Sequence, residues 1–202
     1  MKTIGIIGTG LSGITAAFYL KDYFQVYLFD KSRGVGGRIA TRRSETCEFD
    51  HGAPFFSATS DAFNQFLQPL IESKHVSPWT MKSIQLETKK IEQEHVFVGT
   101  PSMNHMMKYF KSQLNIQTQT SIKELTRKNN KWQLFDENFL HIGDFDWVIS
   151  TAPAEQTKAI IPPHISFYNH LKSYSMHGNV VTMVQANNIQ HFNFDVAHSA
   201  HK

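Results

Sequence analysis

A glycine-rich turn near the amino end constrains the fold of this chain more than any other feature of the sequence. Gly8, Gly10 and Gly13 form the pattern G-x-G-x-x-G. The apolar run over residues 3–7 predicts a buried strand before the turn, an apolar pattern of helical spacing follows it, and residues 25–29 predict a second strand. The order strand, glycine turn, helix and strand is typical of a βαβ unit that binds a dinucleotide at the turn.

The residue types of this unit suit a bound pyrophosphate and ribose. Gly8 permits a tight turn, Gly10 leaves no side chain between the backbone and the pyrophosphate, and Gly13 lets the helix pack close against the strand. The amino end of the helix presents unpaired N–H groups and a positive dipole end to the phosphates. Asp30 directly follows the second strand, and we expect it to accept hydrogen bonds from the adenosine ribose. The alternative is a glycine-rich turn in another kind of α/β protein, and the strand, helix and acid at their expected places argue against it.

Composition and charge describe an ordinary globular chain with a local excess of positive charge. The 202 residues are 41% hydrophobic and 18% charged, with a net charge of +3, which fits one or two domains and no disordered segment. Five of the 20 lysines and arginines fall within residues 31–43. This cluster indicates an anionic ligand rather than a nucleic-acid surface. Its members are Lys31, Arg33, Arg38, Arg42 and Arg43.

The single cysteine and the lengths of the apolar runs bear on where the protein acts. Cys47 has no partner for an internal disulfide, which fits a reducing compartment, and we interpret it as a half-buried thiol without a redox role. No apolar run approaches transmembrane length, and the glycine turn explains the apolar first 20 residues better than a signal peptide does. We therefore expect a cytoplasmic protein without a membrane partner.

The middle of the chain predicts a helix, a pair of strands and a second helix. Residues 60–74 predict a helix with Ser60 as its N-cap, and residues 76–98 predict two or three antiparallel strands. Thr100 and Pro101 are expected to begin the second helix, as an N-cap followed by proline at the first helical position. Its predicted buried face consists of Met103, Met106, Met107, Phe110 and Leu114.

The last third predicts short strands and ends in a polar tail. Residues 117–125 and 132–135 predict a hairpin, residues 145–151 a further strand, and residues 180–185 the last strand. The tail from Ala186 has no helix or strand period, and we interpret its histidines as solvent-exposed residues rather than as a metal site.

Three parts of the sequence together resemble one family. They are the opening βαβ unit, the glycine- and arginine-rich segments over residues 33–38, 40–42 and 49–53, and Thr151-Ala152-Pro153 after an apolar run. In these parts the chain resembles a flavoprotein of the amine-oxidase superfamily, and most closely a renalase-like NAD/FAD-dependent oxidoreductase. The discriminating feature is the doubled glycine before arginine, Gly36-Gly37-Arg38, which marks flavin rather than nicotinamide binding and argues against a plain NAD-binding module.

The resemblance implies FAD as the cofactor and assigns its phosphate and adenosine parts. Asp30 would hold the ribose, and Ile122 would meet the adenine through its backbone. The adenosine end would be bordered by Thr151, Ala152 and Pro153. The pyrophosphate would lie on the glycine turn, formed by Gly8, Gly10, Leu11, Ser12 and Gly13.

The resemblance also assigns the remainder of the cofactor. Lys31, Arg33 and Arg38 would lie along the diphosphate and ribityl chain, where arginine supplies a planar set of charge-assisted donors. His51 would be near the flavin ring, but we interpret it as structural, and no catalytic residue is predicted because the cofactor carries the redox chemistry. The ring itself would be approached by Gly52, Ala53, Pro54 and Phe55.

The predicted fold class is α/β: a Rossmann-type FAD-binding domain with a parallel sheet, plus a partial, mostly antiparallel substrate domain. The first domain is expected over residues 1–80 and 99–161, and the second over residues 81–98 and 162–202. The activity implied by the resemblance is the oxidation of a dihydronicotinamide isomer of NAD(P)H, or of an amine. Oxygen would be the electron acceptor and hydrogen peroxide the product.

Two departures from the family pattern leave an alternative open. Pro54 stands where many relatives carry glutamine, and it removes a backbone N–H that could serve the flavin. Relatives are also longer, and their last part returns to complete the flavin site, whereas nothing after Gln185 resembles that part. The sequence is therefore expected to be truncated at the carboxyl end, and the alternative is a non-catalytic remnant with weak or no dinucleotide binding.

Overall fold

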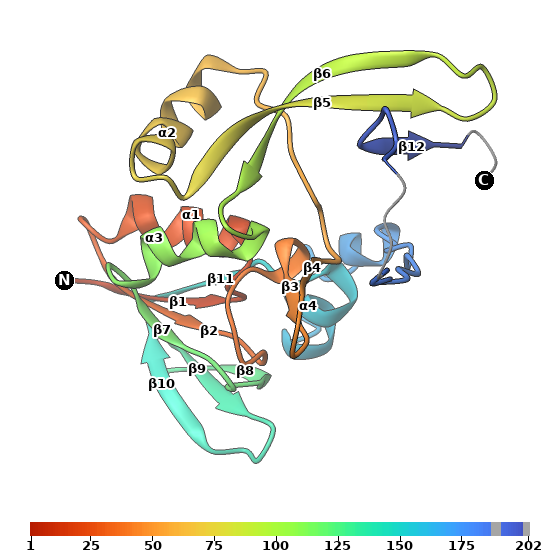
Figure 1. Cartoon of the computed structure of the whole chain (residues 1–202). Helices are drawn as coiled ribbons and strands as arrows, with labels where there is room; N and C mark the ends of the chain where they lie inside the picture. The colour runs from red at the N-terminus through yellow and green to blue at the C-terminus, as the bar shows by residue number, and fades with distance from the viewer. Residues whose placement is uncertain (187–190, 200–202) are drawn as a thin grey trace. The chain divides into compact units, whose positions relative to one another are not determined.

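The structure, a computed structural model, describes residues 1–186 and 191–199 (Figure 1). The chain forms two compact units, each made of two segments. The first unit is Met1–Ile39 with Met107–Val180, and the second is Ala40–Met106 with Val181–Lys202. None of the helices in the described residues is both long enough and apolar enough to span a membrane.

The first unit is built on a parallel sheet that begins with the predicted βαβ unit. Strand β1 (Thr3–Ile7), helix α1 (Leu11–Leu20) and strand β2 (Gln25–Phe29) follow one another in the predicted order, and both strands have the predicted bounds. Strands β7 (Asn115–Gln117) and β11 (Trp147–Ser150) complete the sheet in the order β11-β1-β2-β7, and every neighbouring pair is parallel. The mixed α/β fold and the Rossmann-like parallel sheet predicted from the sequence are confirmed.

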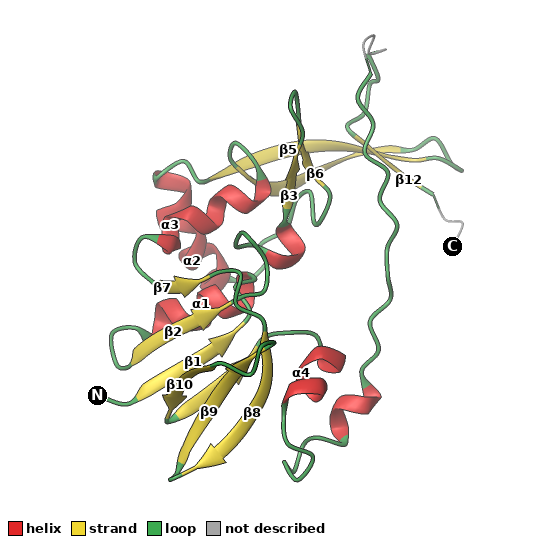
Figure 2. Ribbon diagram, turned by 90° about the horizontal axis from the view of Figure 1, so that it is seen from below, coloured by secondary structure: helices red, strands yellow, loops and turns green. Residues whose placement is uncertain are grey.

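Both faces of this sheet are covered. Figure 2 shows α1 on one side of β1 and β2, and an antiparallel sheet on the other. That antiparallel sheet consists of β8 (Ile122–Lys128), β9 (Lys131–Asp136) and β10 (His141–Phe145). The period-two alternation of the strands explains the two cores. The core under α1 contains Ile4, Ile6, Ala17, Val26 and Leu28. The core under the antiparallel sheet contains Ile7, Phe29, Ile122, Leu125, Leu134 and Phe145.

Short helices complete the first unit. The 3-10 helix η1 (Gly37–Ile39) follows the glycine doublet, and α3 (Lys108–Lys111) precedes β7. After β11 the chain forms α4 (Ala154–Ile160) and then η3 (His170–Ser173).

The second unit is mostly antiparallel. Strands β5 (Val76–Gln85) and β6 (Ile91–Gly99) form the predicted antiparallel pair, and β3 (Thr41–Arg43) pairs with β4 (Glu48–Asp50). Helix α2 (Asp61–Glu72) begins as predicted, because the Ser60 hydroxyl accepts a hydrogen bond from the Phe63 N–H at 3.3 Å. Cys47 is half-buried, as expected.

The helix predicted to start at Thr100 and Pro101 starts later. The Thr100 hydroxyl donates to the Ser77 hydroxyl at 3.0 Å, and the 3-10 helix η2 (Met103–Met107) follows. Both carboxylate oxygens of Asp50 lie 3.1 Å from the Met103 N–H, so a side chain distant in sequence satisfies the start of the helix. The predicted buried face is confirmed for all of its members except Leu114, which is half-buried.

The predicted hairpin and the strand within residues 145–151 are present with other bounds, and the strand predicted over residues 180–185 is wrong. Gln117 ends the parallel strand β7 and is not part of the hairpin, which is formed by β8 and β9 alone. Residues 145–151 form two elements, since Phe145 ends β10 and Trp147 begins β11. Residues 180–185 form no strand.

The tail differs from its prediction as well. Residues Val196–His198 form strand β12, which runs parallel to β5. His198 therefore lies in a strand, whereas His201 lies outside the described residues. The boundaries of the two compact units differ from the boundaries of the two functional domains predicted from the sequence. The division into functional domains remains a prediction.

Candidate dinucleotide-binding site

The parallel strands end at one edge of the sheet, and the predicted site residues of the first unit follow those ends. Gly8 follows β1, Asp30 follows β2 and Thr151 follows β11. The Gly8 N–H donates to the Phe29 carbonyl at 2.8 Å, and the Thr151 N–H donates to the Ile7 carbonyl at 2.9 Å. In open α/β sheets, ligands bind outside the carboxyl ends of the strands, so this edge is the candidate site.

Two glycines of the turn are required by the geometry of the chain itself. Gly8 has a φ of +105°, a conformation that side chains strongly disfavour. A Cβ on Gly13 would lie 2.0 Å from the Gly8 carbonyl oxygen, which is far inside contact distance. The Thr151 hydroxyl donates to the Ile7 and Gly8 carbonyls at 3.1 and 3.3 Å, so β11 supports the same turn.

Gly10 is different, because nothing in the described structure requires glycine there. It is the N-cap residue of α1, with φ −70° and ψ 177°, which any residue adopts. A Cβ built on it would meet only Gly37 Cα at 3.9 Å and the Gly36 carbonyl oxygen at 4.0 Å, which is ordinary contact. A group outside the chain that comes close to this backbone would account for the missing side chain.

The glycine doublet lies against the glycine turn, backbone to backbone. Gly36 and Gly37 have φ values of +126° and +55°. The Gly36 N–H donates to the Thr9 carbonyl at 3.0 Å, and a Cβ on Gly37 would lie 3.1 Å from Gly10 Cα. The doublet therefore has a structural role of its own, which is to let one loop contact the other closely.

The first turn of α1 is suited to an anion. It carries no acidic residue and no side-chain cap, and the first N–H groups of a helix have no partner within the helix. Leu11 is half-buried and Ser12 is exposed at this end. The positive end of the helix dipole is thus not neutralised by a carboxylate of the same turn.

The Asp30 carboxylate accepts more hydrogen bonds from the protein itself than the sequence predicts. One carboxylate oxygen accepts from the Thr9 N–H and the Thr9 hydroxyl, both at 2.7 Å, and the other accepts from the Ser32 N–H at 2.8 Å. Burial raises the pKa of Asp30, but the hydrogen bonds from Ser32 and Thr9 outweigh it and hold the pKa below its ordinary value. A carboxylate has about four acceptor positions, so one remains for a ligand, and the ribose contact remains a prediction.

Thr9 is the residue that sequence reasoning missed. It is fully buried and bonds to Asp30 through both its N–H and its hydroxyl. Its carbonyl also accepts the hydrogen bond from Gly36. The only signal available was a hydroxyl residue between two glycines, followed by an acid after the next strand.

The basic residues of the cluster over residues 31–43 differ in their partners. Lys31 Nζ lies 3.2 Å from Gln156 Oε1, and neither Arg33 nor Arg38, both exposed, makes an ion pair with any residue that the structure describes. Arg43 instead pairs with Glu48 in the second unit, and its guanidinium holds the pKa of Glu48 below the ordinary value. In the first unit, therefore, Arg33 and Arg38 are the arginines available to an anion at the edge of the sheet.

The adenosine-side residues lie on segments joined to the same edge. Ile122 is buried at the start of β8, and the loop before it is tied to the end of β2, because the Thr120 N–H donates to the Asp30 carbonyl at 2.8 Å. Pro153 is the N-cap residue of α4, and the Ala152 carbonyl accepts from the Thr157 hydroxyl at 3.1 Å.

The residues predicted to meet the flavin ring lie in the second unit. Of these, Gly52 and Phe55 are half-buried, and Ala53 and Pro54 are exposed. The Phe55 ring packs edge-on against Trp79, with centroids 6.3 Å apart. The buried Nδ1 of His51 has no hydrogen-bond partner among the described residues. No three His, Cys, Asp or Glu side chains in residues 1–186 and 191–199 are close enough together to hold a metal ion.

Comparison with known proteins finds similarity in sequence and in fold. Residues 6–70 match the family described as NAD(P)-binding Rossmann-like domain. Prenylcysteine oxidase 1 of Bos taurus is 32% identical over an alignment of 81 residues that covers 38% of this chain and 16% of that protein. Among solved structures, a CLA-producing fatty acid isomerase from P. acnes matches with a TM-score of 0.67 and 10% identity, over 85% of this chain and 63% of the other.

A redesigned putrescine oxidase matches equally well in fold, with a TM-score of 0.66 and 10% identity, over 84% of this chain and 62% of the other. At this identity the likeness shows the fold alone, and the names of an isomerase and an oxidase illustrate that one fold serves different reactions. The chain thus spans under two thirds of these structures and a small part of prenylcysteine oxidase 1. Residues 6–70 are thus similar to the NAD(P)-binding Rossmann-like family, and the solved structures share the fold of this chain.

Proposed function

We propose that the chain binds FAD at the carboxyl edge of its parallel sheet and belongs to the FAD-dependent oxidoreductases. The observation that carries the proposal is Gly10, where neither the backbone conformation nor the packing of the described residues requires glycine. A diphosphate lying on this backbone accounts for the missing side chain. Because the N–H groups and dipole at the start of α1 point to the same place, the ligand is expected to be anionic.

The donors on this edge fit a dinucleotide diphosphate. Leu11, Ser12 and Gly13 would offer backbone N–H groups, and Arg33 and Arg38 would supply charge-assisted donors from exposed side chains. Asp30 has acceptor capacity left for one ribose hydroxyl. Bound FAD would supply the redox chemistry, while these residues bind and orient it. The distinction between flavin and nicotinamide rests on the resemblance carried by Gly36-Gly37-Arg38, and the neighbours named as oxidases support it.

The substrate we propose is a dihydronicotinamide isomer of NAD(P)H or an amine. Either substrate loses a hydride, which carries two electrons and one proton, and oxygen takes these up with one further proton to give hydrogen peroxide. The amine supplies this further proton as it becomes an imine, whereas water supplies it when the substrate is a dihydronicotinamide. The support is the renalase-like resemblance in sequence and the names prenylcysteine oxidase and putrescine oxidase among the matches.

The proposal is tested on the purified chain. We expect a yellow protein with a flavin absorption band, and FAD as the compound released on heating. If the chain purifies without cofactor, added FAD should lose its fluorescence saturably as it binds. A chain that neither carries FAD nor binds it when added would refute the proposal. Binding of a nicotinamide dinucleotide in place of FAD would refute FAD as the cofactor and assign NAD(P) instead.

The substrate is then tested by peroxide formation. The FAD-loaded chain is mixed with dihydronicotinamide isomers or with simple amines such as putrescine, and peroxide is measured with a coupled peroxidase dye. Peroxide from one class and not the other identifies the substrate. Absence of peroxide with both classes, from a chain that binds FAD, would refute the proposed oxidase activity without refuting the cofactor.

A further inference from the structure

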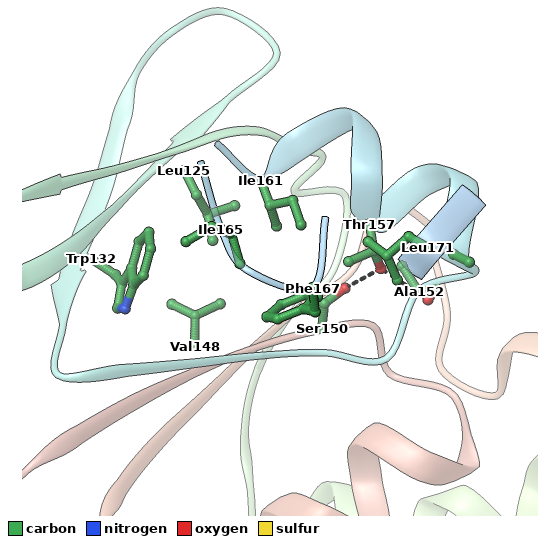
Figure 3. A pocket seen from close by; sticks show the side chains of 11 residues that line it. Leu125, Trp132, Val148, Ser150, Ala152, Thr157, Ile161, Ile165, Phe167 and Leu171 are labelled. Atoms are coloured by element: carbon green, nitrogen blue, oxygen red, sulfur yellow. Dashed lines mark hydrogen bonds between the residues drawn. The ribbon is translucent and has the colours of Figure 1, made fainter. Parts of the chain in front are cut away.

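A second candidate site lies inside the first unit, apart from the glycine turn. It is a cavity of about 370 Å³ bordered by β8, β9, β11 and the segment from α4 to η3 (Figure 3). Its volume falls in the range of small-molecule sites, roughly 300–1,000 Å³. Most of its wall is apolar, including Leu125, Trp132, Val148, Ile161 and Ile165.

The alternation of β11 separates this cavity from the dinucleotide edge. The side chains of Val148, Ser150 and Ala152 line the cavity, whereas Thr151 directs its hydroxyl to the carbonyls of Ile7 and Gly8 in the glycine turn. Successive residues of a strand face opposite sides, so the end of one strand borders two different sites. Ala152 is the one residue that lines the cavity and also belongs to the predicted cofactor set.

The side chains that line the cavity offer an anionic ligand no opposite charge, and they offer a ligand one hydrogen-bond acceptor. None of the described residues that line the cavity is charged. Its polar feature is a pair of hydroxyls, Ser150 Oγ and Thr157 Oγ1, 2.7 Å apart and marked by the dashed line in Figure 3. Because the Thr157 hydroxyl donates its proton to the Ala152 carbonyl at 3.1 Å, the Ser150 hydroxyl must donate to Thr157. The lone pairs of Ser150 Oγ then remain available to accept a hydrogen bond from a ligand.

We propose that this cavity binds a small uncharged molecule with an aromatic or aliphatic body and one hydroxyl or N–H donor. The apolar wall would take the body, and Ser150 Oγ would accept from the donor. At about 30 Å³ per water, the cavity has the volume of about 12 waters, so a bicyclic aromatic alcohol is a suitable size. This proposal does not depend on FAD binding, because its ligand and its hydrogen bond are separate from the glycine turn.

The first test compares two probes of the same ring system, one with an O–H donor and one in which a methyl group replaces the donor hydrogen. The full chain is titrated by calorimetry with 1-naphthol and with 1-methoxynaphthalene, which has no donor. We expect saturable binding at one site per chain, with naphthol bound about two- to tenfold more tightly, as one net hydrogen bond predicts. In the variant Ser150→Ala this preference should disappear while methoxynaphthalene binds as before. Absence of saturable binding of both probes, or a preference that persists in Ser150→Ala, would overturn the proposal.

The second test fills the cavity. Ile165 is half-buried in the loop between α4 and η3, and Ile165→Trp should weaken both probes at least about tenfold, since the larger ring occupies their space. Leu140→Trp is the matched control, because Leu140 is 64% exposed and does not line the cavity. Circular dichroism checks the fold of both variants. If Ile165→Trp is folded and binds the probes like the wild type, the cavity is not the site; if it fails to fold, the result with Ser150→Ala decides.

Discussion

Asp30 stabilises the turn that it is expected to serve. Three hydrogen bonds from Thr9 and Ser32 converge on its carboxylate, and hydrogen bonds to a charged group contribute more than neutral ones. The amide of an asparagine cannot accept all three, because its nitrogen would face a donor. The variant Asp30→Asn should therefore be less stable by about 1–3 kcal/mol, measured by urea unfolding at neutral pH. Asp22→Asn is the control, because Asp22 is exposed and its carboxylate pairs with Lys21 at the surface.

The same carboxylate predicts a dependence on pH. The pKa of Asp30 is lowered in the folded chain from 3.8, since the hydrogen bonds from Ser32 and Thr9 outweigh the burial that would raise it. A lowered pKa stabilises the folded state above the unfolded pKa, and this contribution is lost as the pH falls through the folded pKa. Below about pH 4, the unfolding free energy of the wild type should fall more steeply than that of Asp30→Asn. Equal slopes would contradict the role assigned to Asp30.

The glycine doublet gives a second prediction at the same scale. Gly37→Ala places a Cβ at a φ of +55° and 3.1 Å from Gly10 Cα, and the left-handed conformation alone costs an L-residue about 1–2 kcal/mol. Gly34→Ala is the matched control in the same loop, because its Cβ would meet no atom within 4 Å. Thermal unfolding should show a lower midpoint for Gly37→Ala and an unchanged one for Gly34→Ala. If the two variants unfold alike, the close contact between the loops is wrong.

At the scale of elements, the N-cap of α2 is the simplest to test. The Ser60 hydroxyl satisfies one N–H of the first helical turn, and replacing such a cap with alanine costs about 1 kcal/mol. Ser60→Ala should lower the unfolding free energy by this amount in urea titrations. Ser57→Ala, on an exposed residue shortly before the helix, should leave it unchanged. A Ser60→Ala chain as stable as the wild type would mean that the cap is not formed.

Elements were predictable where the signal is local. Strands β1 and β2 and helix α2 follow from apolar periodicity, a glycine turn and a capping serine, all read within a few residues. The three-residue strand β7 was missed because its place is set by parallel pairing with β2, far away in sequence. Four of the six residues 180–185 are apolar, yet the segment forms no strand in the described structure, and Val180 is 98% exposed. Apolar residues predict a strand, but a strand also needs a neighbour with which to pair.

The candidate site was predictable to the same extent. The glycines, Asp30 and Thr151 do lie at one edge of the sheet, because parallel strands bring their carboxyl ends together. The contact of Gly36 and Gly37 with the turn, and the hydrogen bonds from Thr9 to Asp30, could not be predicted, because they depend on backbone positions that no residue pattern encodes. The cavity beside Ser150 and Thr157 was missed for the same reason, since its wall comes from five separate elements and loops.

At the scale of the whole molecule, the central claim is that FAD lies on the backbone of Gly10. It is tested most directly by titrating FAD into the wild type, Gly10→Ala and the control Gly34→Ala while following flavin fluorescence. Among the described residues, a Cβ at Gly10 meets only ordinary contacts, so Gly10→Ala should unfold at the same temperature as the wild type. It should nevertheless bind FAD at least about tenfold more weakly, a loss of roughly 1.4 kcal/mol, whereas Gly34→Ala should bind like the wild type. A Gly10→Ala chain that binds FAD as tightly as the wild type, or a wild type that does not bind FAD, would contradict the account.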